Sequence, residues 1–131
     1  MICAIPEAYS VIALRRLKEF QDSIQKYHLI DVFGVVLSFW DKRGAVNEAF
    51  LSEINASFPD KVFDSKVRRD IAVSRVVLAG KTVFDFDGAS NAATDYKGLA
   101  KEFLKRLTSI EVGVCNIKKM VKGKKTGAAH G

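Results

Sequence analysis

The feature that most constrains the fold is an apolar run at residues 32–40, in which polar and apolar side chains do not alternate. Residues 32–39 are mainly β-branched or aromatic, a pattern typical of a parallel strand that is covered on both faces. Gly34 and Ser38 interrupt the run, and it reaches only about half the length of a membrane span. We therefore interpret it as a buried strand of a soluble domain.

The segments around this run alternate between strand patterns and helix patterns. Further strands are expected at 2–5, where Pro6 ends the run, and more weakly at 61–67, with a short extended run at 82–86. Apolar residues at helical spacing predict helices at 7–27, 46–58, 70–79 and 91–107. Gly80 is expected to end the third of these helices. This order predicts an α/β fold, in which a partial parallel sheet has helices on its faces.

The chain has 131 residues, the usual size of one domain, and it opens directly on a strand pattern. We therefore expect no room for a first strand–helix unit that carries a ligand-binding loop. In isolation, such a partial sheet has an unpaired edge and an uncovered apolar face. Either a partner or poor solubility is expected from this.

The positive charge is concentrated near the C-terminus. Residues 110–131 account for +4 of the formal net charge of +6, because only Glu111 opposes their five lysines: Lys118, Lys119, Lys122, Lys124 and Lys125. We divide the chain into an α/β part at 1–109 and a Lys/Gly-rich tail at 110–131. The tail is expected to be flexible and to attract polyanions, or to be a solubilising extension without a specific partner.

No pattern of residues points to catalysis or to metal binding. The sequence has no Gly-rich phosphate-binding loop of the type G-x-x-x-x-G-K-[ST], and no His/Cys cluster with zinc spacing. His28 and His130 are isolated, and Cys3 is expected to be an inert residue of a buried strand. Trp40, which is next to charged residues, is expected to be half exposed. With two cysteines and no signal-peptide pattern, we expect a cytoplasmic protein.

An ordered series of segments carries a resemblance to a known family. The segments are Ile5-Pro6-Glu7, residues 33–43 (FGVVLSFWDKR), residues 61–63 (KVF), residues 67–74 (VRRDIAVS), residues 79–87 (AGKTVFDFD) and residues 90–102 (SNAATDYKGLAKE). Together they resemble the C-terminal half of the ParA/Soj family of partition ATPases, the deviant-Walker P-loop group that includes MinD. The resemblance covers about residues 1–108 and implies part of a P-loop NTPase fold.

The resemblance implies that the family's P-loop, magnesium-binding acid and switch regions precede Met1. ATP and magnesium are cofactors of the intact family, and none is expected for this chain alone. A residual adenine pocket is implied at Ser38, where the strand ends, and at the loop formed by Arg68, Arg69 and Asp70. Arg68 stands where many relatives have proline, and without phosphate contacts any nucleotide is expected to bind weakly.

The resemblance also implies non-specific binding of double-stranded DNA. Arg43 matches a basic DNA-binding position of the family, and Lys42 precedes it. A second such position is Ala72 here, and Arg75 is expected to replace it from the same face of the helix. The further basic residues expected nearby are Arg68, Arg69 and Lys81. The residues alone equally allow a solvated turn at 42–43 and ion pairs of Arg68 and Arg69 with Asp64 or Asp70.

We therefore expect a truncated ParA-family partition protein that binds DNA and docks a ParB-like partition protein or a full-length ParA. Three alternatives stay open: a fragment of a longer, complete ParA ATPase, a decoy that pairs with full-length ParA, and a remnant without function. The expected location is the cytoplasm, at the nucleoid if the DNA contacts form, with no membrane partner.

Overall fold

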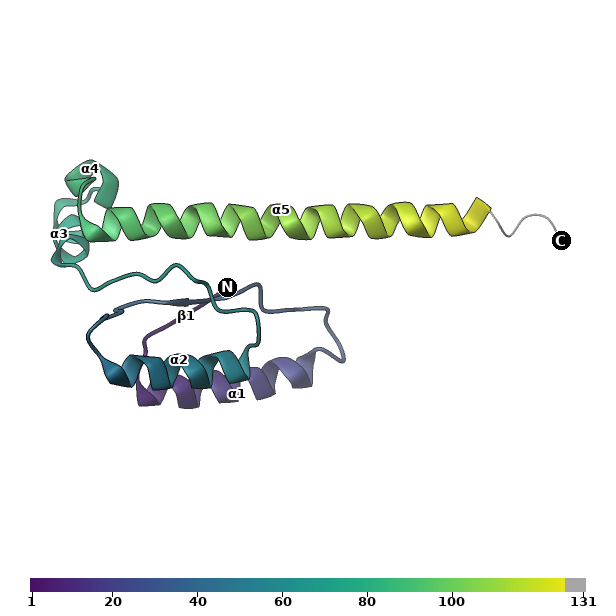
Figure 1. Cartoon of the computed structure of the whole chain (residues 1–131), viewed down its shortest axis with the longest axis horizontal. Coiled ribbons are helices and arrows are strands. Elements are labelled where there is room, and N and C mark those ends of the chain that lie inside the picture. Colours follow the sequence, from purple (N-terminus) through teal and green to yellow (C-terminus); the bar gives the residue numbers. More distant parts are fainter. Residues whose placement is uncertain (127–131) are drawn as a thin grey trace. The chain divides into compact units, whose positions relative to one another are not determined.

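The computed structural model describes the backbone of residues 1–126 and the side chains of residues 1–111. The chain divides into two compact units, Met1–Leu99 and Ala100–Gly131. The order of elements is β1 (Ile2–Ala4), α1 (Ala8–Ile24), β2 (Val35–Leu37), α2 (Ala45–Ser57), α3 (Ile71–Ala79), α4 (Val83–Asp87) and α5 (Asn91–Thr126), as Figure 1 shows. The expected α/β class is confirmed.

The sheet of the first unit is small and parallel. β1 pairs with β2 in the register Ile2↔Val35, Cys3↔Val36 and Ala4↔Leu37. The strand expected at 61–67 is not formed as a continuous element. Instead, single parallel bridges join Val35 to Val62 and Trp40 to Arg68, so this segment runs beside β2 without forming a regular ladder.

The main core lies between the sheet and the pair α1 and α2, which lie side by side on one face of the sheet (Figure 1). Val35 and Leu37 of β2 belong to this core because alternate residues of a strand face the same side. The helices and the neighbouring segments contribute Val11, Leu14, Trp40, Ile54 and Phe58. Trp40 is buried, with 8% of its surface exposed, so the half-exposed position expected for it is wrong.

A second group of buried residues lies outside this cluster. It comprises Val36 of β2, Phe63 and Val67 of the bridged segment, Ala72 and Val76 of α3, and Ala92 and Ala93 at the start of α5. Gly34 is required where the bridged segment approaches β2, because a Cβ there would collide with the ring of Phe63. Cys3, in contrast, is exposed, so its expected burial is wrong.

The ends of α3 follow from its sequence. The Asp70 carboxylate accepts a hydrogen bond from the Ala72 N–H at 2.9 Å, and Gly80 ends the helix at φ 61°, a conformation that glycine adopts without a Cβ penalty. The extended run expected at 82–86 is wrong, because residues 83–87 form α4. Thr82 caps this helix by accepting a hydrogen bond from the Asp85 N–H at 3.2 Å.

The helix expected at 91–107 forms within α5, which continues to Thr126. The backbone of the expected tail is thus helical as far as it is described. The side chains of its five lysines lie outside the described residues, so their role stays a prediction. Within the described part of the chain, no helix combines the length and apolar character that a bilayer span needs.

Candidate functional site at the carboxyl edge of the sheet

The predicted site residues lie on connections that leave the same edge of the sheet. Because β1 and β2 are parallel and residues 62–68 run beside them in the same direction, their carboxyl ends share one edge. Residues 5–7, 38–43 and 68–70 follow these ends. Ligands of open α/β sheets bind outside the carboxyl ends of the strands. This edge is therefore the candidate functional site.

All four residues predicted for an adenine pocket line one hollow of about 290 Å³. They are Ser38, Arg68, Arg69 and Asp70. Its apolar lining includes the side chains of Phe39, Ile71 and Tyr96, which sequence reasoning did not select. The volume is at the lower end of the roughly 300 to 1,000 Å³ of small-molecule sites. The apolar lining and small size fit a flat aromatic base better than a whole nucleotide.

Phe39 adopts φ 55° at the carboxyl end of β2, a conformation that is uncommon for a bulky residue. Such backbone strain costs roughly 1 to 3 kcal/mol and is found preferentially at functional sites. Phe39 is 55% exposed and lines both this hollow and a larger one. No local sequence signal marks this residue, because its conformation depends on the chain reversal after β2.

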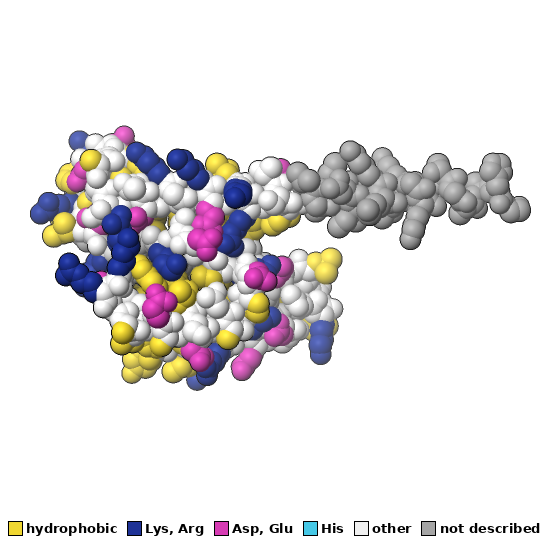
Figure 2. All heavy atoms as spheres, viewed as in Figure 1, with side chains coloured by type: hydrophobic (Ala, Val, Ile, Leu, Met, Phe, Trp, Pro, Cys, Tyr) yellow, Lys and Arg dark blue, Asp and Glu magenta, His cyan; other side chains and the backbone are white. Residues whose placement is uncertain are grey.

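The larger hollow has a volume of about 680 Å³, and its lining includes more basic than acidic residues. Its four basic residues are Lys42, Arg43, Arg68 and Arg69, and its two acidic residues are Glu7 and Asp41. On the face in view, Figure 2 shows several Lys and Arg side chains close together with acidic side chains among them. This hollow thus brings together four of the six residues predicted for DNA binding.

The turn that carries Lys42 and Arg43 is held by the side chain of Asp41. Its carboxylate accepts a hydrogen bond from the Arg43 N–H at 2.9 Å, and its backbone carbonyl accepts one from the Asn47 side chain in α2. Lys42 and Arg43 themselves are exposed. Their backbone is therefore fixed while their side chains are free to reach a polyanion in solvent.

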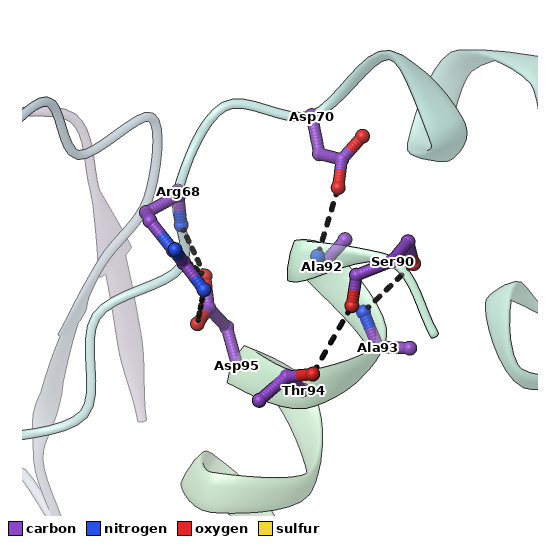
Figure 3. A network of polar contacts seen from close by, with 7 residues as sticks. All are labelled: Arg68, Asp70, Ser90, Ala92, Ala93, Thr94 and Asp95. Carbon is purple, nitrogen blue, oxygen red and sulfur yellow. Dashed lines mark hydrogen bonds and ion pairs between the residues drawn. The ribbon is translucent and has the colours of Figure 1, made fainter. Parts of the chain in front are cut away.

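Arg68 is engaged within the protein rather than with solvent. Asp95 of α5 accepts hydrogen bonds from the Arg68 backbone N–H and Nε at 2.9 Å and from Nη2 at 2.8 Å (Figure 3). These bonds raise the pKa of Arg68 and lower the pKa of Asp95 from its ordinary value of 3.8. Sequence reasoning offered Asp64 or Asp70 as the partner. The ion pair of Arg68 is instead with Asp95, which reaches it only through the tertiary fold, and Asp70 adds a smaller electrostatic attraction.

Asp70 joins the start of α3 to the start of α5. One carboxylate oxygen accepts from the Ala72 N–H and the other from the Ala92 N–H, both at 2.9 Å, as Figure 3 shows for Ala92. These two hydrogen bonds lower the pKa of Asp70, and the bond from the Ala72 N–H has the larger effect. Since both oxygens already accept hydrogen bonds, this residue shapes the hollow more than it recognises a ligand.

Arg75 and Lys81 lie elsewhere. Both are exposed, and neither lines the two hollows at the carboxyl edge. Ala72 is buried with 5% of its surface exposed, whereas Arg75, about one turn further along α3, is exposed. The structure therefore separates the predicted DNA-binding set into a group of four and two outlying residues on and after α3.

A magnesium nucleotide is implied by the family resemblance, and the described residues fit only part of it. The smaller hollow suits a base. Among the described residues, no group of three or more His, Cys, Asp or Glu is placed to hold a metal ion. Neither a phosphate-binding loop nor a magnesium ligand can thus be assigned from this part of the chain.

Comparisons with known proteins give the following relatives. A ParA family protein of Chlamydia pneumoniae is 44% identical over 110 residues, which are 84% of this chain and 43% of the relative. The virulence plasmid ParA family protein pGP5-D of Chlamydia muridarum is 38% identical, over 83% of this chain and 41% of the relative. The chromosome partitioning protein ParA of Caulobacter vibrioides is 28% identical, over 78% of this chain and 40% of the relative. No family model matches. The chain spans about two fifths of the length of these curated relatives.

Proposed function

We propose that this chain, a partial ParA-like sequence homologous to ParA family proteins over most of its length, supplies a DNA-binding surface to a partition protein. One observation carries the proposal: Lys42, Arg43 and Arg69 project from two different connections around one basic hollow. Each of them is exposed. Lysine and arginine side chains bind phosphates irrespective of base sequence.

The expected contacts are electrostatic. Phosphate contacts supply most of non-specific affinity and make it strongly dependent on salt. Lys42, Arg43 and Arg69 are assigned to phosphate binding. Arg68 is assigned to holding the connection in place, because Asp95 already engages its guanidinium. Arg75 and Lys81 are assigned at most to peripheral contacts.

The test is binding of the purified chain to a labelled random-sequence duplex, followed by fluorescence anisotropy. The double variant Lys42→Ala/Arg43→Ala should weaken binding about tenfold or more, since a hydrogen bond to a charged group contributes roughly 1.5 to 3 kcal/mol. The double variant Arg16→Ala/Lys26→Ala removes the same charge from exposed positions outside both hollows and is the matched control. Equal losses in the two variants would contradict the proposal.

A weak adenine-binding activity is the second candidate, and it rests on the smaller hollow that collects all four predicted residues. Adenosine should shift NMR signals of residues that line this hollow, and Ile71→Asp should abolish the shifts. Val77→Asp places the same charge on an exposed residue of α3 outside the hollow and should leave them unchanged. Shifts that persist in Ile71→Asp would exclude the smaller hollow as the adenosine-binding site.

The proposal also includes a partner protein and a location in the cell. A ParB-like partition protein or a full-length ParA is the expected partner, at the nucleoid. The alternatives are a fragment of a longer ParA ATPase, whose P-loop would be encoded upstream in frame, and a decoy. A decoy should co-purify with full-length ParA and disturb partition when overproduced.

A further inference from the structure

Apolar residues in the second part of α5 follow a heptad spacing. They recur alternately three and four residues apart, and the backbone of α5 is helical over their whole range. This is the a and d pattern of a coiled coil, in which a repeat of 3.5 residues keeps one row facing a partner helix. The row covers about three heptads. We name its members the α5 seam: Ala100, Phe103, Leu107, Ile110, Val114, Ile117 and Val121.

The described members of the α5 seam are accessible. Leu107 and Ile110 are 38% and 51% exposed, Ala100 is also exposed, and Phe103 is half-buried. Leu104, which is next to the seam, is 60% exposed and widens its apolar surface. The last three members lie outside the described side chains, so their places in the seam follow from the sequence alone.

The opposite face of the same turns is polar. Lys105, Thr108 and Ser109 are exposed. The hydroxyls of Thr108 and Ser109 each donate a hydrogen bond of 2.9 Å to a backbone carbonyl of the preceding turn. At about 100° per residue, each of them lies about 130° around the helix from the midpoint of Leu107 and Ile110. This part of α5 is therefore amphipathic.

The second compact unit has no described element of its own that could cover the α5 seam. It comprises Ala100–Gly131, and over residues 100–126, where its backbone is described, it consists of α5 alone. A helix in water is stabilised mainly by packing of its apolar face. Gly113 and Gly123 are poor helix formers, so this helix gains more than most from a partner.

The charges beside the seam favour a second copy of this chain. Arg106 and Glu111 occupy a g and an e position, five residues apart. In a parallel coiled coil, g and e residues of the two helices form ion pairs across the seam, so Arg106 of each copy would meet Glu111 of the other. Arg106 also donates to Glu102 of its own helix at 2.8 Å. A guanidinium has five N–H donors, which are enough for both carboxylates.

We propose that the α5 seam pairs with the α5 seam of a second copy, as a parallel two-stranded coiled coil over residues 100–121. This interaction goes beyond the proposed function. It uses none of the residues assigned to DNA, so the two proposals can fail separately.

The first test is sedimentation of the purified chain over a range of concentrations, without DNA. The chain should form dimers, and Leu107→Asp/Ile110→Asp should raise their dissociation constant about tenfold or more, as expected for central apolar contacts. Thr108→Asp/Ser109→Asp adds the same charge to the polar face of the same turns and is the matched control. Cooperative urea unfolding verifies that both variants are folded. Equal weakening by the two variants, or a chain that stays monomeric, would overturn the proposal.

The second test locates the pairing by disulfide cross-linking, in a Cys3→Ser/Cys115→Ser background. Ile110→Cys should cross-link two copies rapidly, because d residues of parallel helices face each other within reach of a disulfide. Thr108→Cys, on the polar face, should cross-link about tenfold more slowly or less. Equal rates at the two positions would overturn the parallel seam, even if dimers form.

Other occupants of the seam give other results. A chain that is monomeric and binds vesicles of anionic phospholipid, with that binding lost in Leu107→Asp/Ile110→Asp, would overturn the proposal and assign the seam to a membrane surface. Lys42→Ala/Arg43→Ala should leave the dissociation constant of the dimer unchanged, because these residues lie outside the seam. Failure of DNA binding and failure of the pairing are thus distinguishable.

Discussion

Asp95 sets the geometry of the carboxyl edge, although it lies 27 residues beyond its partner Arg68 in the sequence. Its side chain is only 12% exposed, and it accepts hydrogen bonds from both the backbone and the guanidinium of Arg68. The pair fixes the start of the connection that carries Arg69 and Asp70. We therefore regard Asp95 as a positioning residue for the basic hollow.

Replacing Asp95 by asparagine removes the charge and leaves too few acceptors for Arg68. We expect Asp95→Asn to lower the free energy of unfolding by about 1 to 2 kcal/mol, as measured by urea denaturation. Asp60→Asn is the control. Asp60 is exposed and has φ 60°, a conformation that asparagine also adopts, so this change should leave stability nearly unaltered. A smaller loss for Asp95 than for Asp60 would contradict the positioning role.

Acid should destabilise the fold through three carboxylates. The pKa of Asp95 is lowered by hydrogen bonds from Arg68, that of Asp70 by the N–H groups of Ala72 and Ala92, and that of Asp31 by Lys61. Each group binds protons more tightly in the unfolded chain. Its contribution is therefore complete above the ordinary value of 3.8 and is lost as the pH falls through the folded value.

The measurement is the free energy of unfolding from about pH 7 to about pH 3. It should be nearly constant down to about pH 5 and then fall, and Asp95→Asn should show a shallower fall. A stability that rises on acidification across this range would contradict the cause given for these shifts.

Helices were predictable where their caps are local in sequence. α3 has Asp70 as its N-cap and Gly80 at its end, and its predicted bounds of 70–79 are confirmed to within one residue. α4 was not predicted, because Phe84 and Phe86 alternate with aspartates as in a strand, although Thr82 and Asp85 together form a local cap signal. The bridged segment at 61–67 could not be separated from a strand, because pairing depends on its neighbours.

Two glycines allow a test at the scale of the helix. Gly80 has φ 61°, and no atom lies within 4 Å of the position that an added Cβ would take, so Gly80→Ala should cost about 1 kcal/mol through backbone strain alone. Gly98 lies inside α5, where an added Cβ would approach nothing closer than the Ser65 hydroxyl at 3.9 Å. Gly98→Ala should therefore stabilise by about 0.5 to 1 kcal/mol. Thermal unfolding of both variants measures this, and equal signs would contradict the assigned conformations.

At the scale of the whole molecule, the order of strand and helix patterns was sufficient to predict an α/β fold and a parallel sheet. The resemblance to ParA family proteins was predictable from the ordered segments and is confirmed by a relative that matches 84% of the chain. That Ser38 and residues 68–70 lie together was expected only from the family resemblance, and both line one hollow. The ion pair of Arg68, the burial of Trp40 and the exposure of Cys3 were not predictable, because each depends on residues far along the chain.

The most direct measurement of the DNA-binding surface is the dependence of duplex affinity on salt concentration, for the unchanged chain and for Lys42→Ala/Arg43→Ala/Arg69→Ala. Each phosphate contact contributes about one unit to the slope of log affinity against log salt, so the triple variant should have a slope smaller by about three. An unchanged slope, or binding that disappears only when residues 110–131 are deleted, would contradict the assignment of DNA binding to the carboxyl edge.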